Sequence, residues 1–292
     1  MSEVHNTDAG WGEGRNESME RSFETPGPVS LRVENASGKV EIETSRGGRT
    51  DVLIIALHPA ADELVRRARV SERSTSFGHE VTVEIPHARP RARLWSADSA
   101  AVGVLVRVPP DTGIDVSTAS ASVGAHGRYG AARIRSASGA VSLDEIIGRA
   151  KVRTANGDIQ LRTVGDTADV ETAAGDVRIG AAAAGAKITT ASGDVRLSES
   201  LQGVTIKTAS GDQRIDRAAA GDYLLQAVSG DIAVAVVPGS LVRFDAGSIS
   251  GHVQSDIEVQ SDRPAEAAGD VAKLSIQAKT VSGDISVVRA AG

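Results

Sequence analysis

The chain has 292 residues, a formal net charge of −6, 31 glycines, no cysteine and only 2% aromatic residues. This composition excludes a disulfide framework and thiolate chemistry, and it disfavours nucleic-acid binding, which uses basic faces and aromatic stacking platforms. No run approaches the roughly 20 apolar residues that a membrane-spanning helix needs, so the sequence predicts no membrane span.

Residues 1–24 are polar, rich in glycine and without hydrophobic periodicity, which predicts a disordered tail. They also lack the basic, apolar and small-residue order of a secretion signal. We therefore expect the protein to stay in the cytoplasm.

Residues 25–112 contain several short runs in which apolar and polar positions alternate. VSLRVENASGKVEIET, from Val29, predicts two strands about a Ser-Gly turn, and DVLIIAL, HEVTVEI and VGVLVRVPP predict further strands. PAADELVRRAR, from Pro59, has the proline start, early acids and late arginines of a short helix. This region is therefore predicted to be a β-rich N-terminal cap that contains one short helix.

The segment HARPRAR, residues 87–93, is the one dense basic run and lies just before Trp95. Short basic runs are common in solvated loops, which is the simplest interpretation. The alternative is a loop that docks onto an acidic partner or onto anionic lipid headgroups. Its contact residues would be Arg89, Arg91, Arg93 and Trp95.

Residues 113–292 contain an internal repeat in which a turn glycine recurs every 18 residues, until the spacing loosens near the C-terminus. Positions two and four after the glycine are apolar, as in Val141 and Leu143, and the second strand of each coil pairs a bulky row with a row made mostly of alanine. A constant period indicates stacked coils. We predict an all-β fold: a parallel β-solenoid of the β-helix or β-roll type, preceded by the N-terminal cap.

The motif Thr-Ala-Ser-Gly-Asp is predicted to close one corner of each coil. Glycine suits a backbone with positive φ, and the neighbouring Ser and Asp can accept hydrogen bonds from turn amides. We therefore predict a structural turn ladder of two columns. Its glycines are Gly139, Gly157, Gly175, Gly193, Gly211 and Gly230, and its acids are Asp158, Asp176, Asp194, Asp212 and Asp231.

A column of carboxylates about 4.8 Å apart would repel one another, and a bound cation could relieve the repulsion. Calcium-binding β-rolls also have 18-residue coils, but their glycine doublet is absent here and the oxygen ligands fall short of the roughly six to eight that calcium prefers. Backbone capping is therefore the favoured role of the aspartates, and no metal or cofactor is predicted.

The outward positions of the predicted coils carry charged columns. Arg178, Arg196 and Arg214 share one column, while Arg153 and Glu171 are neighbours in another, where they can form an ion pair. A solvated face of long side chains is the simplest interpretation. The alternative is a stripe that binds an anion or a partner.

Sequence motifs of known catalytic sites are absent. The 6 histidines are scattered, and there is no nucleophile elbow, P-loop or dinucleotide-binding glycine motif. A uniform ladder gives every coil the same residue, whereas catalysis needs an asymmetric group with separated pKa values. We therefore predict that the protein is not an enzyme.

The stretch VLVRVPPDTGIDVSTASASV, followed by the recurring SGDV and SGDI, resembles a bacterial β-strand-repeat family of unknown function, the putative adhesins or toast-rack domains. The resemblance runs from about Val29 to the C-terminus and is most specific at the valine-rich strand, Pro109 and the Ser-Gly-Asp coils. It implies a stacked β-solenoid and a role in surface or envelope contacts, and it supplies no catalytic residues.

These observations predict a non-enzymatic interaction scaffold that binds a protein partner or its own copies. The alternative is a carbohydrate-binding or polysaccharide-active β-helix module, which should present aromatic platforms to sugar rings. The chain has only 3 Phe, 2 Tyr and 2 Trp, which favours the scaffold.

The last strand of the sequence, Asp284 to Val288, is expected to form the C-terminal edge of the solenoid. The proline-containing insertion at residues 261–270 is predicted to cover this edge. If the edge is open instead, it should pair with another chain.

Overall fold

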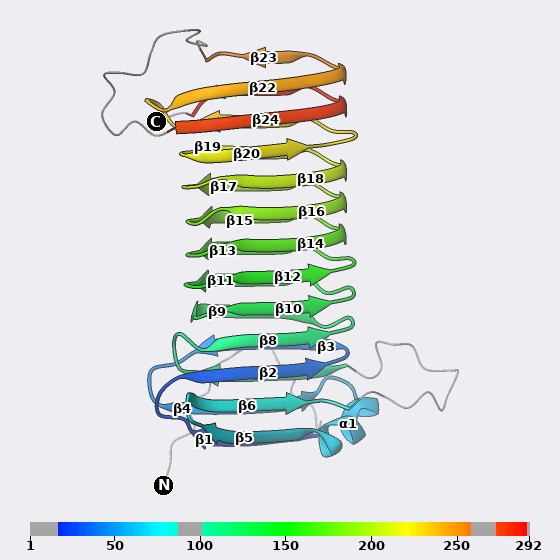
Figure 1. Ribbon diagram of the computed structural model, residues 1–292. Coiled ribbons are helices and arrows are strands. Elements are labelled where there is room, and N and C mark those ends of the chain that lie inside the picture. Colours follow the sequence, from blue (N-terminus) through cyan, green and yellow to red (C-terminus); the bar gives the residue numbers. More distant parts are fainter. Residues whose placement is uncertain (1–16, 87–100, 258–272, 291–292) are drawn as a thin grey trace.

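The computed structural model describes residues 17–86, 101–257 and 273–290. In these residues two long sheets face each other, and most turns of the chain add one strand to each sheet (Figure 1). The prediction of an all-β parallel solenoid with a β-rich cap and one short helix is confirmed.

The first sheet has 13 strands. From the N-terminal to the C-terminal end of the stack they are β1 (Ser18–Glu24), β4 (Arg49–Ala56), β7 (Val102–Val108), β3 (Gly38–Thr44), β9 (Ser122–Tyr129), β11 (Val141–Ile146), β13 (Ile159–Val164), β15 (Val177–Ala182), β17 (Val195–Ser200), β19 (Gln213–Ala218), β21 (Ile232–Val236), β25 (Ile285–Arg289) and β23 (Val253–Ser255).

The second sheet has 12 strands. In the same direction they are β5 (Arg69–Thr75), β6 (Gly78–Glu84), β2 (Val29–Asn35), β8 (Gly113–Thr118), β10 (Ala132–Ser136), β12 (Ala150–Thr154), β14 (Ala168–Ala174), β16 (Ala186–Ser192), β18 (Val204–Ser210), β20 (Gly221–Gln226), β24 (Lys273–Ser282) and β22 (Leu241–Ser250).

The N-terminal end of the stack differs from the rest because its outer strands are antiparallel. β1 pairs with β4, β4 with β7, and β5 with β6 in this way. The 3-10 turn η1 (Pro59–Ala61) and helix α1 (Asp62–Arg67) contact β1 and β4, as the proline and charge pattern predicts. β2 and β3 pair directly with β8 and β9, so the cap and the repeat share the same two sheets.

The predicted disordered tail is wrong for its last residues, because Ser18–Glu24 form strand β1. Every residue of β1 aligns with a residue of β4, and Met19 and Phe23 pack against the core. Pairing with a distant strand therefore orders a segment whose local composition predicts none. Residues 1–16 lie outside the described part of the chain.

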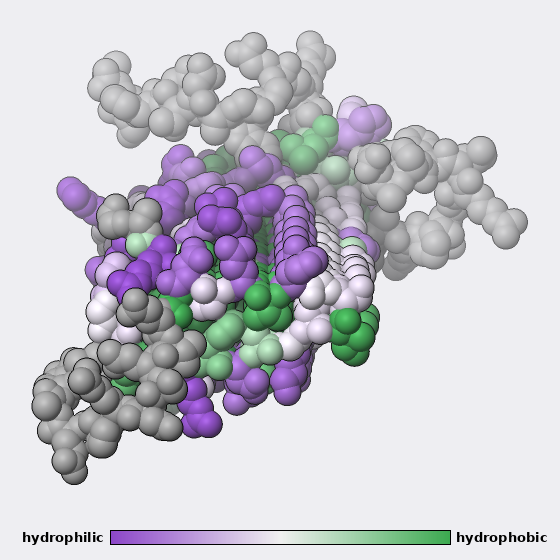
Figure 2. Space-filling model, turned by 90° about the horizontal axis from the view of Figure 1, so that it is seen from above, coloured by the Kyte–Doolittle hydropathy of each residue, from purple (hydrophilic) through white to green (hydrophobic). Residues whose placement is uncertain are grey.

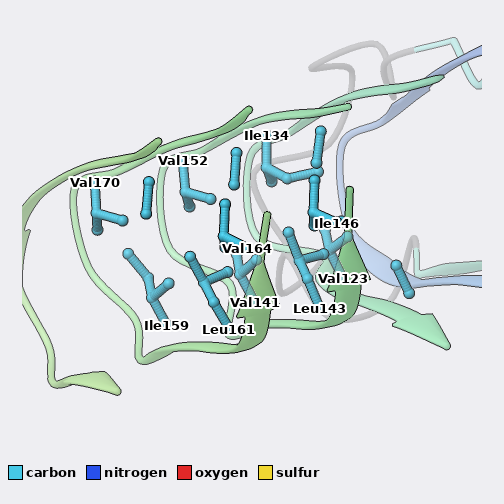
Figure 3. Packing of buried hydrophobic residues seen from close by; sticks show 14 of the residues in the cluster. Val123, Ile134, Val141, Leu143, Ile146, Val152, Ile159, Leu161, Val164 and Val170 are labelled. Carbon is cyan, nitrogen blue, oxygen red and sulfur yellow. The ribbon is translucent and has the colours of Figure 1, made fainter. Parts of the chain in front are cut away.

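The interior between the sheets is filled by aliphatic side chains in register. Ile134, Val152 and Val170 of the second sheet face Leu143 and Leu161 of the first (Figure 3). The predicted alanine row is also in register, since Ala132, Ala150, Ala168 and Ala186 are successive partners in the second sheet. Burial of each large aliphatic side chain contributes about 1.5–3 kcal/mol, so the repeat itself supplies the stabilising core.

The coil order at the C-terminal end differs from the sequence order, and this corrects the predicted edge. β24 lies between β20 and β22, and β25 lies between β21 and β23. The last strand of the sequence is therefore internal, and β22 and β23 form the end of the stack. The repeat period fixes the length of a coil but not the order in which coils stack, because every coil offers its neighbours similar apolar rows. The predicted covering insertion, residues 261–270, lies outside the described part of the chain.

Candidate interaction surface

The turn glycines form a column at one edge of the stack, as the repeat predicts. Gly157, Gly175, Gly193, Gly211 and Gly230 all have positive φ, between 123° and 133°. Each also lies against the coil before it: a Cβ on Gly193 would overlap the carbonyl oxygen of Gly175. Gly139 does not have positive φ, but a Cβ there would overlap the carbonyl oxygen of Ala121. Close approach between coils, as well as φ, therefore requires glycine.

The aspartates of the turn ladder bond to the backbone of the next coil. Oδ1 of Asp158 accepts a hydrogen bond of 3.0 Å from the N–H of Asp176, and Oδ1 of Asp176 accepts one of 3.0 Å from Asp194. The chain of bonds continues through Asp212 and Asp231 to Asp284 and ends at the N–H of His252. The carboxylates thus satisfy turn amides along the stack.

Threonines support the same corner from inside the turn. Oγ1 of Thr154, Thr172 and Thr190 donates to the carbonyl oxygen two residues later, at 2.9, 3.0 and 3.0 Å. Among the described residues no group of three or more His, Asp or Glu side chains could hold a metal ion. The geometry of the ladder is that of a backbone cap.

The arginine column of the first sheet is paired with acids. Arg178 lies 2.8 Å from Asp176, while Asp216 lies between Arg196 and Arg214, at 2.9 and 2.6 Å. Burial raises the pKa of the Asp216 carboxyl, but hydrogen bonds from the two arginines outweigh burial and hold this pKa below its usual range. The column is therefore a row of adjacent arginines flanked by acids rather than an unpaired basic stripe.

The outer face of the second sheet carries a second set of ion pairs. Arg153 and Glu171 lie 2.9 Å apart, which is the pair that the sequence analysis identifies. Lys151 and Asp169 lie 3.0 Å apart in the adjacent column. Arg133 lines a shallow groove beside these residues and forms no ion pair with the described part of the chain.

A β-bulge in β9 gathers titratable side chains that the sequence analysis leaves scattered. The register with β11 shifts between Leu143 and Glu145, where Gly127 has φ of 116°. Nε2 of His126 lies 3.2 Å from Glu41, and Asp144 Oδ2 accepts a hydrogen bond of 3.2 Å from the Gly127 N–H. The signal in the sequence is the interruption of alternation by His-Gly within SVGAHGRY.

Two buried tyrosines hold the strands near both ends of the repeat. The hydroxyl of Tyr129 donates to the carbonyl oxygen of Ile42 at 2.7 Å, and that of Tyr223 donates to Ser200 at 3.2 Å. Burial raises the pKa of both phenols. Both therefore stay protonated donors in the core and do not offer an aromatic surface.

The basic docking loop predicted at Arg89, Arg91, Arg93 and Trp95 lies outside the described residues. In the part of the chain that is described, no helix is long and apolar enough to cross a membrane. The surface residues that the structure places together are thus the turn ladder, the arginine column and the ion pairs of the second sheet.

Comparison with known proteins gives one family match. The family described as Toastrack DUF4097 matches residues 72–288. No curated protein matches the chain.

Solved structures share the architecture at low sequence identity. A putative adhesin from Parabacteroides distasonis has a TM-score of 0.53 at 9% identity, covering 94% of this chain and 98% of its own. A putative adhesin from Bacteroides fragilis has a TM-score of 0.45 at 13% identity, covering 93% and 97%. A putative lipid binding protein, also from Parabacteroides distasonis, has a TM-score of 0.32 at 10% identity, covering 94% and 98%. The first of these shares the fold of this chain.

Proposed function

Because the chain belongs to the Toastrack DUF4097 family, we propose that it is a non-enzymatic interaction scaffold that binds a protein partner or its own copies. The observation that carries the proposal is the arginine column on the outer face of the first sheet. Arg178, Arg196 and Arg214 have side chains 56–60% exposed, and Asp176 and Asp216 hold them at the spacing of the strands.

A surface of this kind suits recognition of another protein. Parallel coils fix the charges about 4.8 Å apart, so the column is pre-organised before a partner arrives. Ordering long side chains on binding costs about 0.5–1.5 kcal/mol each, and ion pairs formed in advance reduce that cost. The surface would fit a partner whose charges complement a row of exposed arginines flanked by acids.

The alternative function, carbohydrate binding or polysaccharide cleavage, receives less support from the placement of aromatic residues. Tyr129 and Tyr223 are buried, and Phe23 and Phe244 are partly buried against the core. Phe77, in the turn between β5 and β6, is the one described aromatic side chain that is strongly exposed. A sugar platform would need exposed rings along one face.

Site-specific photo-cross-linking tests the proposed partner surface. We expect p-benzoylphenylalanine in place of Arg196 to give discrete protein adducts in cells. The matched control places the same group at Thr189, which is exposed on the outer face of the second sheet. Equal adducts at both positions, or reproducible binding on a glycan array without adducts, would contradict the proposal.

The cellular location and the basic loop remain predictions with their own tests. Cell fractionation separates the predicted cytoplasmic protein from the envelope-associated protein that the adhesin neighbours favour. Co-sedimentation with anionic vesicles tests docking through Arg89, Arg91, Arg93 and Trp95. Serine in place of Trp95 should weaken this binding if the indole anchors the loop.

A further inference from the structure

The second sheet ends in a long strand that is paired on one side. β22 has 10 residues and pairs with β24, and no described strand lies on its other side (Figure 1). An open edge presents a row of unpaired N–H and C=O groups, which favours pairing with another strand. The corresponding end strand of the first sheet, β23, has only 3 residues.

The edges at the opposite end of the stack carry charges that discourage such pairing. β1 includes Glu20, Arg21 and Glu24, all exposed, and β5 includes Arg69 and Arg73. β22 has two charged residues, Arg243 and Asp245, and its other large side chains are apolar: Leu241, Val242, Phe244 and Ile249, of which Ile249 is 83% exposed. The protection that natural edge strands usually have is thus present at one end of the molecule and weak at the other.

The core row of β22 is incompletely covered. Val242, Phe244 and Ala246 are only partly buried, whereas their partners in β24, Leu274, Ile276 and Ala278, are at most 2% exposed. Figure 2, which views the molecule onto this end, shows apolar side chains at the surface between polar rims. One more coil stacked on β22 would bury Val242, Phe244 and Ala246, as each internal coil buries the core-facing residues of the coil beside it.

We propose that a second copy of the chain supplies that coil, with β22 of the two copies paired antiparallel across a two-fold axis. Strand geometry restricts the register, because directly opposed residues of an antiparallel pair point to the same face. Core-facing residues of β22 must therefore lie opposite core-facing residues of its copy.

Charge favours one register over its two nearest alternatives. With Phe244 opposite its own copy, Arg243 lies opposite Asp245 of the second copy, and Val242 lies opposite Ala246. Registers that keep core-facing residues opposite one another differ by two residues. The two neighbouring registers of this kind set Arg243 against Arg243 or Asp245 against Asp245, which is repulsive. The chosen register forms two ion pairs and one aromatic pair at the axis.

Both charges are free to make these contacts. Arg243 and Asp245 form no ion pair within residues 17–86, 101–257 and 273–290, although they point to the same outer face of β22. Their neighbours in β24 are the neutral Ser275 and Gln277. Several other arginines of the sheets pair with a neighbouring acid, as Arg153 does with Glu171.

This inference rests on the proposed scaffold function and identifies one of its partners as a second copy. Sedimentation velocity of the purified full chain over a concentration series tests it, and photo-cross-linking at Arg196 tests the other surface separately. We expect a monomer–dimer equilibrium in the wild type. Arg243→Asp and Asp245→Arg should each weaken the dimer about tenfold or more, because each creates two like-charge pairs.

The double variant R243D/D245R restores opposite charges across the axis, so it should recover the dimer. Lys207→Asp, on the outer face in the middle of the stack, is the matched control and should leave the equilibrium unchanged. A wild type that stays monomeric over the whole series overturns the proposal, and so does a double variant as weak as the single ones.

A cysteine cross-link tests the register directly, since the chain has no cysteine of its own. Phe244→Cys should form a disulfide-linked dimer, because opposed residues of an antiparallel pair have Cα atoms about 4.5–5.5 Å apart. In Gly247→Cys, where a Cβ meets open space, the two cysteines would lie about 20 Å apart and should not cross-link. Equal cross-linking of the two variants would overturn the register.

Discussion

Oδ1 of Asp194 accepts a hydrogen bond of 2.9 Å from the backbone N–H of Asp212, 18 residues later in the chain. The same bond recurs between successive coils, so the repeat glycine and the repeat aspartate form one structural unit. The glycine allows the coils to approach, and the aspartate satisfies the amide that the turn leaves without a strand partner.

Removing one of these carboxylates should weaken the stack locally. We expect Asp194→Ala to lower the free energy of unfolding by about 1 kcal/mol, as loss of a side-chain cap does at helix ends, and Asp194→Asn to change it little because the amide oxygen still accepts. Chemical denaturation measures the change. Asp222→Ala is the control, because this aspartate is exposed and its side chain forms no hydrogen bond with the described residues; an equal loss there would refute the capping role.

Glycine at the turn should tolerate no side chain. Gly193 has φ of 123° and lies against the carbonyl oxygen of Gly175, so Gly193→Ala combines backbone strain with overlap between coils. We expect a loss of at least about 2 kcal/mol. Gly113→Ala, where a Cβ meets open space and φ is not positive, should change the unfolding free energy by less than about 0.5 kcal/mol.

Gln213 is the one polar residue in its column of the core and offers a stabilising substitution. Its aligned neighbours are Val195 and Ile232, and its Oε1 is buried without a hydrogen-bond partner in the described structure. Its Nε2 donates to Thr208 and to the carbonyl of Gln226. We expect Gln213→Val to raise the free energy of unfolding by about 1 kcal/mol, since an unpaired buried acceptor costs about as much or more. A lower melting temperature would show that the two bonds outweigh the unpaired oxygen.

Acid should weaken the arginine column through Asp216. The folded-state pKa of this carboxyl is lowered, so its contribution is present above the unfolded pKa of about 3.9 and is lost as the pH falls through the folded pKa. Asp216→Asn should therefore cost up to about 1 kcal/mol at pH 7, and this cost should shrink as the pH falls through the folded pKa of Asp216. Denaturation curves of the wild type and of Asp216→Asn between pH 7 and acid measure the difference in their free energies of unfolding. A difference that does not change with pH would contradict the prediction.

The sequence predicts the repeating part of the fold in detail because one physical constraint acts on every coil. The alternation at Val141 and Leu143, the alanine row and the turn glycines each follow from a strand with one buried face. Asp216 as the partner of Arg196 and Arg214 is harder to predict, because among Arg178, Arg196 and Arg214 only Arg214 has an acid two residues after it.

Features that depend on contacts between distant segments were beyond the sequence pattern. β1 is ordered by pairing with β4, and the insertion of β25 between β21 and β23 depends on which coil covers which apolar row. The charged cluster at His126 requires the bulge that brings Glu41 and Asp144 to it. The repeat period and the alternation of apolar and polar residues describe a single coil, whereas these features depend on how several coils are arranged.

Calcium should have no structural role in the aspartate column. One oxygen of each carboxylate from Asp158 to Asp284 already accepts an amide hydrogen bond, which leaves too few free oxygens for the roughly six to eight ligands that the ion prefers. We expect the melting temperature to be the same in millimolar calcium and in excess chelator.

Asp212→Asn tests the repulsion between the carboxylates separately. This variant should be as stable as the wild type or more so, because the amide keeps the hydrogen-bond acceptor and removes one charge from the column. A cation would be assigned to the column instead if two results were found together. Chelation would lower the melting temperature of the wild type by several degrees, and the melting temperature of Asp212→Asn would not depend on calcium.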